Sequence, residues 1–287
     1  MSIKLDKVKY TYMKNTPFEK IGLNNINLEI SRGEFVAVIG HTGSGKSTLV
    51  QHLKGLLKPD DGSVLVNNVN INDKNNEAKL AKNNIGIVFQ YPEQQLFEET
   101  IYKDISFGPK NMGLTKEEIE SRVKMAMDFV SLDFEKYKNR SPFQLSGGQM
   151  RKVAIAGVIA LQPEYLILDE PTAGLDPVAR DDLFEKISNL YNETGITVIL
   201  VSHNMDDVAR LANRLIVMNN GEISLDNKPE EVFKFKEQLV AAGLALPQIT
   251  ELLIKIKNNG LNVDESIIKI DDAILDIKKA WGVKSKC

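Results

Sequence analysis

The sequence has a single cysteine, Cys287, at its last position. One thiol excludes a disulfide within the chain and a metal cluster held by several cysteines, and it fits a reducing compartment such as the cytoplasm. No apolar run approaches the roughly 18 residues needed to cross a bilayer. Residues 1–11 alternate lysines with apolar residues, so we expect no secretory signal. If the protein works at a membrane, we expect it to lie on the membrane surface and not to span the bilayer.

An excess of charge of either sign is also absent. The 36 basic and 39 acidic side chains give a formal net charge of −3. This balance argues against a protein that neutralises phosphate backbones, so we expect no nucleic-acid partner. Internal repeats, sustained heptads and low-complexity tracts are missing as well. With 43% hydrophobic and 26% charged residues among 287, the chain has the composition of a globular protein with a sizeable core.

Two kinds of strand pattern are present. The first kind alternates apolar and polar residues, which is typical of antiparallel strands with one face in water. The second kind is almost wholly apolar, as in parallel strands covered on both faces, and helical patterns separate its members. Together they predict an α/β fold with a mainly parallel core sheet and an N-terminal antiparallel β subdomain. The expected strands are residues 3–12, 22–30 and 64–66 of the first kind, and 35–39, 85–89, 165–168 and 196–201 of the second.

Two further regions are predicted to be mainly helical. Residues 91–162 offer no good strand and predict an inserted helical subdomain, with helices at 116–129 and 146–161. After a helix at 205–211, Asn220-Gly221 predicts a hairpin turn between short strands at 215–218 and 223–225. Past residue 227 the pattern changes to short amphipathic helices, at 230–239 and 249–257. We therefore expect two units, residues 1–227 and a C-terminal extension of residues 228–287.

A glycine-rich segment follows the first buried strand and matches G-x-x-x-x-G-K-[ST]. Its glycines allow successive backbone N–H groups to face a phosphate, and the helix that follows adds positive potential. We expect Lys46 to span the β- and γ-phosphates and Ser47 to supply a hydroxyl to Mg²⁺. The candidate nucleotide-binding residues are Gly40, His41, Thr42, Gly43, Ser44, Gly45, Lys46, Ser47 and Thr48.

Two adjacent carboxylates, Asp169 and Glu170, end the apolar strand at 165–168. Ligands bind at this edge of parallel sheets. Asp169 is placed to hold Mg²⁺, and Glu170 to orient or deprotonate the attacking water, because phosphoryl transfer depends on positioning and charge neutralisation. By itself such a pair is more often a helix cap, but the upstream glycine-rich loop favours the catalytic interpretation.

A second anion-binding segment, Leu-Ser-Gly-Gly-Gln at residues 145–149, begins another helical pattern. A serine hydroxyl and free N–H groups at a helix start suit a phosphate. The simpler alternative is a helix cap at Ser146. One nucleotide does not need two such segments from the same chain, so the pair favours an assembly of two chains.

Over residues 3–227 these motifs resemble the nucleotide-binding domain of ATP-binding cassette (ABC) proteins, a P-loop NTPase fold. The resemblance implies an ATPase that uses ATP and Mg²⁺. It implies a head-to-tail dimer in which ATP on the P-loop of one subunit is capped by Ser146, Gly148 and Gln149 of the other. ATP binding would close this dimer and hydrolysis would reopen it.

The resemblance also implies roles for four residues outside these motifs. Tyr12 corresponds to the aromatic that stacks on adenine, and Gln90 to a catalytic glutamine that contacts Mg²⁺ and water. Asp176 corresponds to the aspartate that links the two nucleotide sites, and His203 to the histidine that contacts the γ-phosphate.

Residues 91–109 look like the corresponding segment of energy-coupling factor (ECF) transporter ATPases, which include cobalt-importer ATPases and power vitamin and metal uptake. The likeness is to the second of the paired ATPases. It implies a paralogous ATPase partner, or another copy, and a small membrane subunit that binds substrate. It further implies a transmembrane coupling subunit that docks near residues 90–97, and a peripheral place on the cytoplasmic face of the cell membrane. We expect Leu96 and Phe97 either to receive a coupling helix or to anchor their loop to the core.

The C-terminal extension has the size of the small domain that this family places between its ATPases. Its apolar positions predict a mini-core or a dimer face rather than a ligand site: Leu252, Leu253, Ile256, Ile267, Ile274, Ile277 and Trp281. Two alternative functions stay open, the ATPase of another ABC transporter and a soluble ABC ATPase of the iron–sulphur assembly type. The transported substrate is not encoded here, because in this family a separate subunit selects it.

Overall fold

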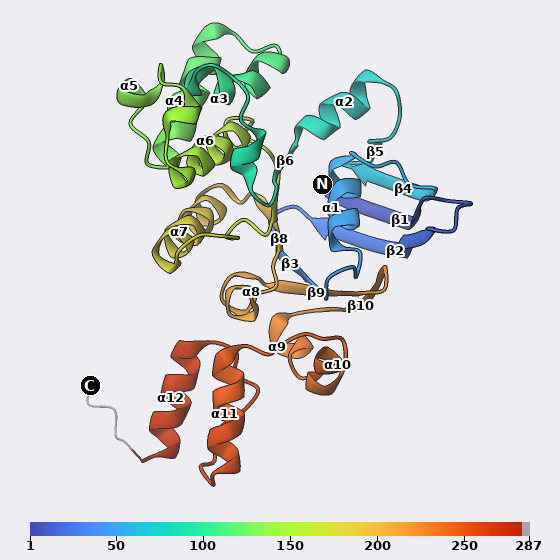
Figure 1. Ribbon diagram of the computed structural model, residues 1–287. Coiled ribbons are helices and arrows are strands. Elements are labelled where there is room, and N and C mark those ends of the chain that lie inside the picture. The colour runs from blue at the N-terminus through green and yellow to red at the C-terminus, as the bar shows by residue number, and fades with distance from the viewer. Residues whose placement is uncertain (283–287) are drawn as a thin grey trace.

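Two β-sheets of different character organise the chain (Figure 1). The computed structural model describes residues 1–282, so Cys287 lies outside the described residues. The N-terminal sheet is antiparallel and contains β1 (Ser2–Tyr12), β2 (Lys20–Ser31), β4 (Asp61–Val66) and β5 (Val69–Asn70), in the order β2-β1-β4-β5. The core sheet contains β3 (Phe35–Ile39), β6 (Ile85–Val88), β7 (Tyr165–Asp169), β8 (Thr197–Val201), β9 (Arg214–Asn219) and β10 (Glu222–Asn227), in the order β10-β9-β3-β8-β7-β6.

The strand patterns in the sequence match these two environments. All five residues of β3 and all five of β8 are buried, because one face of the core sheet packs against the N-terminal sheet and the helix of the P-loop, and the other face packs against helices. In β1 and β2 buried and exposed residues alternate, since one face of that sheet meets water. The parallel strands of the core are β3, β6, β7, β8 and β9, and β10 returns antiparallel to β9. The predicted α/β class with a mainly parallel core sheet and an antiparallel N-terminal sheet is confirmed.

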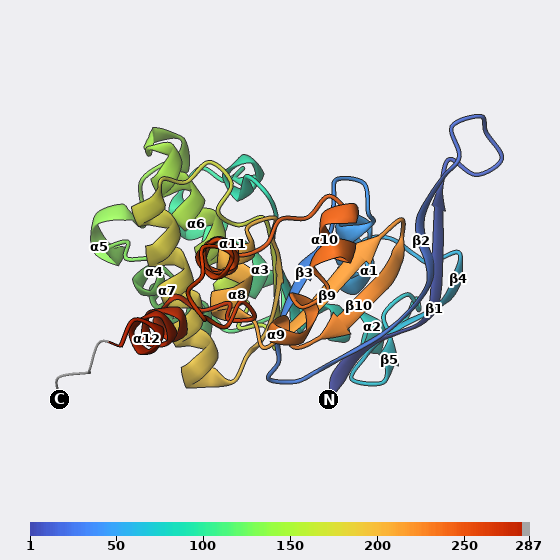
Figure 2. The ribbon, with the colours of Figure 1, turned by 90° about the horizontal axis from the view of Figure 1, so that it is seen from below.

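The helical subdomain inserted between β6 and β7 stands at the end of the core sheet opposite to the N-terminal sheet (Figures 1 and 2). Its helices share one apolar cluster with the core sheet. Side-chain caps fix where two of them begin, at Thr115 and Ser146, each in a reciprocal capping box. The elements are η1 (Pro92–Gln95), α3 (Ile101–Asn111), α4 (Lys116–Phe129), α5 (Phe134–Tyr137), η2 (Pro142–Gln144) and α6 (Gly147–Ile159).

Four further helices pack along the core sheet. The sequence after the P-loop predicts a helix over residues 48–56. The observed helix begins and ends two residues earlier, because Gly45 and Gly55, both in the left-handed region, bound it. The sequence analysis did not predict the helices over residues 76–83 and 177–194, because apolar residues are sparse in both. The four are α1 (Lys46–Lys54), α2 (Asn76–Asn83), α7 (Pro177–Thr194) and α8 (Met205–Leu211).

The C-terminal extension contains α9 (Pro229–Val232), α10 (Lys236–Ala241), α11 (Gln248–Asn258) and α12 (Ile270–Ala280). A single helix over residues 230–239 is therefore wrong. The chain turns at residues 233–235, which lets Phe233 and Leu239 both enter the cluster that packs on β3 and β9.

The second pair of helices has an apolar cluster of its own. Leu253 is fully buried there, and Ile256, Ile267 and Ile277 pack against it, so these predicted positions form a mini-core. The other predicted apolar positions, Leu252, Ile274 and Trp281, are exposed. Within residues 1–282 each helix is too short or too polar to span a bilayer.

One buried lysine ties α1 to the strand that leads to Gln90. The Lys54 ammonium donates hydrogen bonds to the carbonyl oxygens of Lys82, at 3.0 Å, and of Ile85. Burial, together with the charge of Lys82, lowers the pKa of Lys54 to about 8. The Lys54 ammonium therefore fixes the start of β6 through hydrogen bonds to backbone carbonyls.

This shift predicts a pH dependence of stability. In the unfolded chain the pKa of Lys54 returns to about 10.4, so between pH 8 and that value the unfolded state binds more protons than the folded state. The free energy of unfolding of the wild type, relative to the Lys54→Met variant, should rise as the pH increases from 8 to 9.5. Urea unfolding of both proteins at each pH measures this difference, and a constant difference would contradict the assignment.

Candidate functional site

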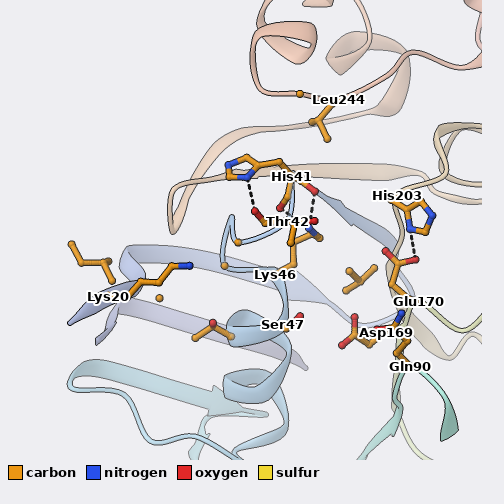
Figure 3. Close-up of a pocket in the computed structure, with 18 of the residues that line it drawn as sticks. Lys20, His41, Thr42, Lys46, Ser47, Gln90, Asp169, Glu170, His203 and Leu244 are labelled. Carbon is orange, nitrogen blue, oxygen red and sulfur yellow. Dashed lines mark hydrogen bonds and ion pairs between the residues drawn. The ribbon is translucent and has the colours of Figure 1, made fainter. Parts of the chain in front are cut away.

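A cavity of about 760 Å³ opens where β3, β7 and β8 end at the carboxyl edge of the core sheet (Figure 3). It gathers segments that lie far apart in the sequence: the P-loop, the end of β1, and the residues that follow β6, β7 and β8. A cavity of this size suits a nucleotide-sized ligand. The predicted residues that line it are Tyr12, Gly40, His41, Thr42, Gly43, Gly45, Lys46, Ser47, Thr48, Gln90, Asp169, Glu170 and His203.

The P-loop curls around its own lysine. The Lys46 ammonium donates to the carbonyl oxygens of Gly40, at 2.6 Å, and His41, at 3.0 Å, which closes the loop into a ring. Gly45 has φ +105°, and a Cβ there would lie 2.6 Å from the carbonyl oxygen of Gly22. Glycine is therefore required, because this contact brings the N-terminal sheet against the loop.

Ser44 differs from its neighbours in the loop. Its side chain is fully buried behind the loop rather than at the cavity, and its Oγ has no hydrogen-bond partner among the described residues. Its backbone N–H donates to the carbonyl oxygen of His41 at 3.1 Å, and its carbonyl accepts from Gly221. The structure thus shows that Ser44 helps to hold the loop, and its contact with nucleotide stays a prediction.

Charges of opposite sign face each other across the cavity. Burial lowers the pKa of Lys46, and the nearby charges of Glu170 and Asp169 oppose this shift. Burial raises the pKa of Asp169, the charge of Glu170 raises it further, and Lys46 opposes both. A divalent cation beside Asp169 would relieve the cost of burying this carboxylate.

Glu170 and His203 contact each other at the wall of the cavity. His203 Nδ1 lies 2.8 Å from Glu170 Oε2, and the Glu170 side chain is only 16% exposed, against 79% for His203. Glu170 has φ +50°, an uncommon conformation for a residue other than glycine. Its N–H donates to the carbonyl oxygen of Val201, which fixes that conformation. Strain of this kind concentrates at functional sites.

Tyr12 lies at the opposite end of the cavity. Its ring rests against Gly22, where a Cβ would be 2.8 Å from the ring carbon Cε2. Its hydroxyl is 3.0 Å from the Thr48 hydroxyl, and Tyr10 packs edge-on at 4.8 Å. An aromatic face so held at the cavity edge can stack on a base.

Asp176 and the predicted binding residues of the segment at 145–149 lie elsewhere. Ser146, Gly148, Gln149 and Asp176 line a separate cavity of about 450 Å³ between α6 and α7. Ser146 and Gln149 form the reciprocal cap of α6, and Asp176 caps α7 by accepting from the N–H groups of residues 178 and 179. The cap interpretation of Ser146 thus holds for the free chain. One chain alone does not bring these residues to the P-loop cavity.

The loop after Gln90 separates the two predicted apolar residues. Leu96 is 8% exposed and joins the core, as the anchoring alternative required. Phe97 is 57% exposed and packs edge-on against Phe107 at 5.0 Å, so an aromatic pair faces outward. The same loop is fixed to α6 by Glu93, which pairs with Arg151 at 3.0 Å.

Several lining residues were missed by sequence reasoning. Lys20 lies opposite Tyr12 in the register of β1 and β2, and its Nζ is 3.6 Å from the place of a Cβ on Gly43. Figure 3 shows its side chain reaching toward the P-loop. No motif marks it, and only the register of the hairpin could have found it. The others are Ile21, Gly22, Val201, Met205, Gly243, Leu244 and Ala245.

The fold and this cavity define a P-loop ATPase with a helical insertion. A family profile described as ABC transporter matches residues 23–173. The energy-coupling factor transporter ATP-binding protein EcfA2 of Clostridium perfringens is 58% identical over 95% of this chain and 96% of its own. EcfA2 of Clostridioides difficile is 50% identical over 100% of both chains.

Two solved structures agree with this assignment. That of cbiO1 from Clostridium perfringens, part of the ABC transporter complex cbiONQ, is 40% identical, with a TM-score of 0.71 over 88% of this chain and 98% of its own. The cassette MJ0796, solved as a dimer bound to ADP and Pi, is 32% identical, with a TM-score of 0.70 over 79% and 98%. The chain belongs to the ABC transporter family, among its energy-coupling factor ATP-binding proteins, and it is an ATPase.

The position of Lys20 predicts an effect on nucleotide affinity. Lys20→Met should weaken ATP binding by about fivefold, because it removes a positive charge near the phosphates. The measurement is a titration with a fluorescent ATP analogue. High salt should reduce the loss, since salt screens exposed charges.

Lys14→Met is the matched control. It lies in the same hairpin, but its ammonium pairs with Asp60 at 2.9 Å. Lys46→Ala serves as the positive control and should weaken binding more strongly. Equal affinities of the Lys20 and Lys14 variants would exclude a role for Lys20 in binding.

Proposed function

We propose that this chain is the ATP-hydrolysing, energy-coupling subunit of an ECF-type ABC importer for vitamins or metal ions. The observation that carries the proposal is the separation of two anion-binding segments, the P-loop and residues 145–149, into two cavities of one chain. Curated relatives at 45–58% identity over nearly the whole chain support the importer assignment. They do not favour the alternatives, another kind of ABC transporter or a soluble iron–sulphur assembly ATPase.

The separated cavities are explained by a head-to-tail dimer. ATP held at residues 40–48 of one subunit would be capped by Ser146, Gly148 and Gln149 of the other, and Asp176 would lie between the two sites. The N-terminus of α6 would supply its N–H groups to the γ-phosphate. The dimeric MJ0796 cassette bound to ADP and Pi supports this arrangement. ATP binding would then close the dimer, and hydrolysis would open it.

The oxygen donors at the cavity suit Mg²⁺. The Ser47 hydroxyl, the Gln90 amide and the Asp169 carboxylate all line it, and Mg²⁺ prefers oxygen ligands together with substrate phosphates. The raised pKa of Asp169 fits a carboxylate that is short of a cationic partner. When bound, Mg²⁺ neutralises charge on the β- and γ-phosphates.

Hydrolysis would use the residues that surround this position. The backbone N–H groups of the P-loop and Lys46 would hold the phosphates, while Tyr12 would stack on adenine. Glu170 would orient the attacking water and accept its proton as the water oxygen bonds to the γ-phosphorus and ADP leaves. His203 would contact the γ-phosphate, and its bond to Glu170 would hold that carboxylate in place. Gln90 would connect Mg²⁺ and water to the loop that follows it.

The membrane partners would contact that loop. The exposed Phe97 and Phe107 would receive a helix of the transmembrane coupling subunit, because an outward aromatic pair suits an apolar side chain. A small membrane subunit would bind the transported substrate. The second ATPase would be a paralogue, or another copy of this chain. The chain would thus lie on the cytoplasmic face of the cell membrane, with residues 1–227 as the nucleotide-binding domain and 228–287 as a dimerisation-type extension.

Glu170→Gln tests the assignment of the catalytic carboxylate. ATP affinity should stay within about threefold of the wild type, because the P-loop is unchanged. Turnover should fall by about 100-fold or more, since a general base contributes at least this factor. Phosphate release and a binding titration measure the two quantities. Glu185→Gln, on the exposed side of α7, is the matched control and should keep its activity. Turnover near the wild-type rate in the Glu170 variant would exclude this role.

The importer assignment is tested by purifying the tagged chain from its native membranes in mild detergent. Mass spectrometry should identify a second ABC ATPase, a transmembrane subunit and one or more small membrane proteins. Recovery of the chain without an integral membrane partner would overturn the importer and leave the ATPase standing.

Two variants locate the membrane contact in the same experiment. Phe97→Asp should retain the ATPase partner but lose the membrane proteins, because a charge cannot enter an apolar contact without cost. Phe18→Asp places the same change on an aromatic residue that is 76% exposed in the β1–β2 hairpin, and it should behave as the wild type.

A further inference from the structure

The loop between α10 and α11, residues 242–247, reaches the nucleotide cavity. Gly243, Leu244 and Ala245 line it, although they belong to the C-terminal extension. A Cβ on Gly243 would lie 4.0 Å from the Cβ of His41, so the two backbones are close. Figure 3 shows Leu244 above His41, with its side chain directed toward the P-loop.

Leu244 is fixed in this position by packing. It is 7% exposed and belongs to an apolar cluster with Ile39, Met205 and Val217. Ile39 ends the strand that leads into the P-loop, and Met205 begins the helix that follows His203. One apolar cluster therefore joins Leu244 of the extension to the strand that precedes the P-loop and to the helix that follows His203.

Two polar contacts hold the loop at residues 242–247 and the neighbouring His41 in place. The backbone N–H of Gln248, the first residue of α11, donates to Asp206 Oδ1 at 2.8 Å in the first turn of α8. On the other side of the loop, His41 Nε2 lies 3.2 Å from Asn219 Oδ1 at the end of β9. His41 thus lies between the core sheet and the extension.

We propose that Gly243 and Leu244 position His41, and with it the phosphate-binding loop, so that nucleotide affinity depends on the place of the C-terminal extension. Leu244 is a positioning residue in this scheme. The P-loop must keep its curl for its N–H groups to face a phosphate, and the extension supports the loop at His41 while Lys46 closes it from within. Coupling between two sites is reciprocal, so bound nucleotide must also restrain the loop at residues 242–247.

The first test compares two truncations within one apolar cluster. Leu244→Ala should raise the Kd and the KM for ATP by about fivefold or more, with kcat changed less than twofold, which corresponds to the lower end of measured coupling. Leu239→Ala removes a leucine of α10 that is 1% exposed, against 7% for Leu244, and does not line the cavity, so it should leave the Kd unchanged. Leu244→Met should restore the affinity. Urea unfolding of each variant separates lost stability from lost positioning.

The second test measures the reverse effect on the unmodified chain. Amide hydrogen exchange at residues 243–248 should slow when ADP binds, by a factor comparable to the affinity change in Leu244→Ala. Exchange in α4, which is remote from the cavity, serves as the control. Wild-type affinity in Leu244→Ala, or unchanged exchange at residues 243–248, would overturn the proposal. If Leu244→Ala does not fold, the exchange measurement decides alone.

Discussion

The parallel register of β7 and β8 is the constraint on which the site depends. It pairs Asp169 with Val201, so the residues that follow these two strands leave the sheet side by side. The Glu170 N–H then bonds to the Val201 carbonyl, and the Glu170 carboxylate meets His203. In the same sheet β3 pairs Val38 with Val201, which brings the P-loop to the same edge. A shift of one residue in either pairing would move these groups apart.

The sequence was informative where function depends on a local run of residues. The P-loop, the carboxylates after β7 and the segment at 145–149 each combine a strand or helix end with a fixed spacing, and such patterns survive without tertiary information. The buried strands were found because parallel strands are apolar on both faces. The ends of helices were predicted less accurately than their presence. In α1, for example, the start and end are set by Gly45 and Gly55, which adopt the left-handed conformation.

Other parts of the site depend on contacts between distant segments. Lys20 comes to the P-loop through the register of a hairpin, and Leu244 through the packing of the extension on β3 and β9. The turn at residues 233–235 likewise follows from the need to bury Phe233 and Leu239 together, against a helical pattern. Ser44 looked like its neighbours in the motif, but its side chain is fully buried and its carbonyl accepts a hydrogen bond from Gly221, far along the chain. None of these features has a signature within a short window.

Arg151 connects the loop that follows Gln90 to the turn that follows Glu170. Its guanidinium forms a fork to the Glu93 carboxylate, at 3.0 and 3.2 Å, and donates a third bond to the Ala173 carbonyl at 2.7 Å. Ala173 is itself bonded to the Glu170 carbonyl. The planar group, 6% exposed, allows no free rotation between these partners. It therefore connects the loop that contains Glu93 and Phe97 to the turn that contains Glu170 and Ala173 through hydrogen bonds of the chain itself, along a path that does not include the nucleotide cavity.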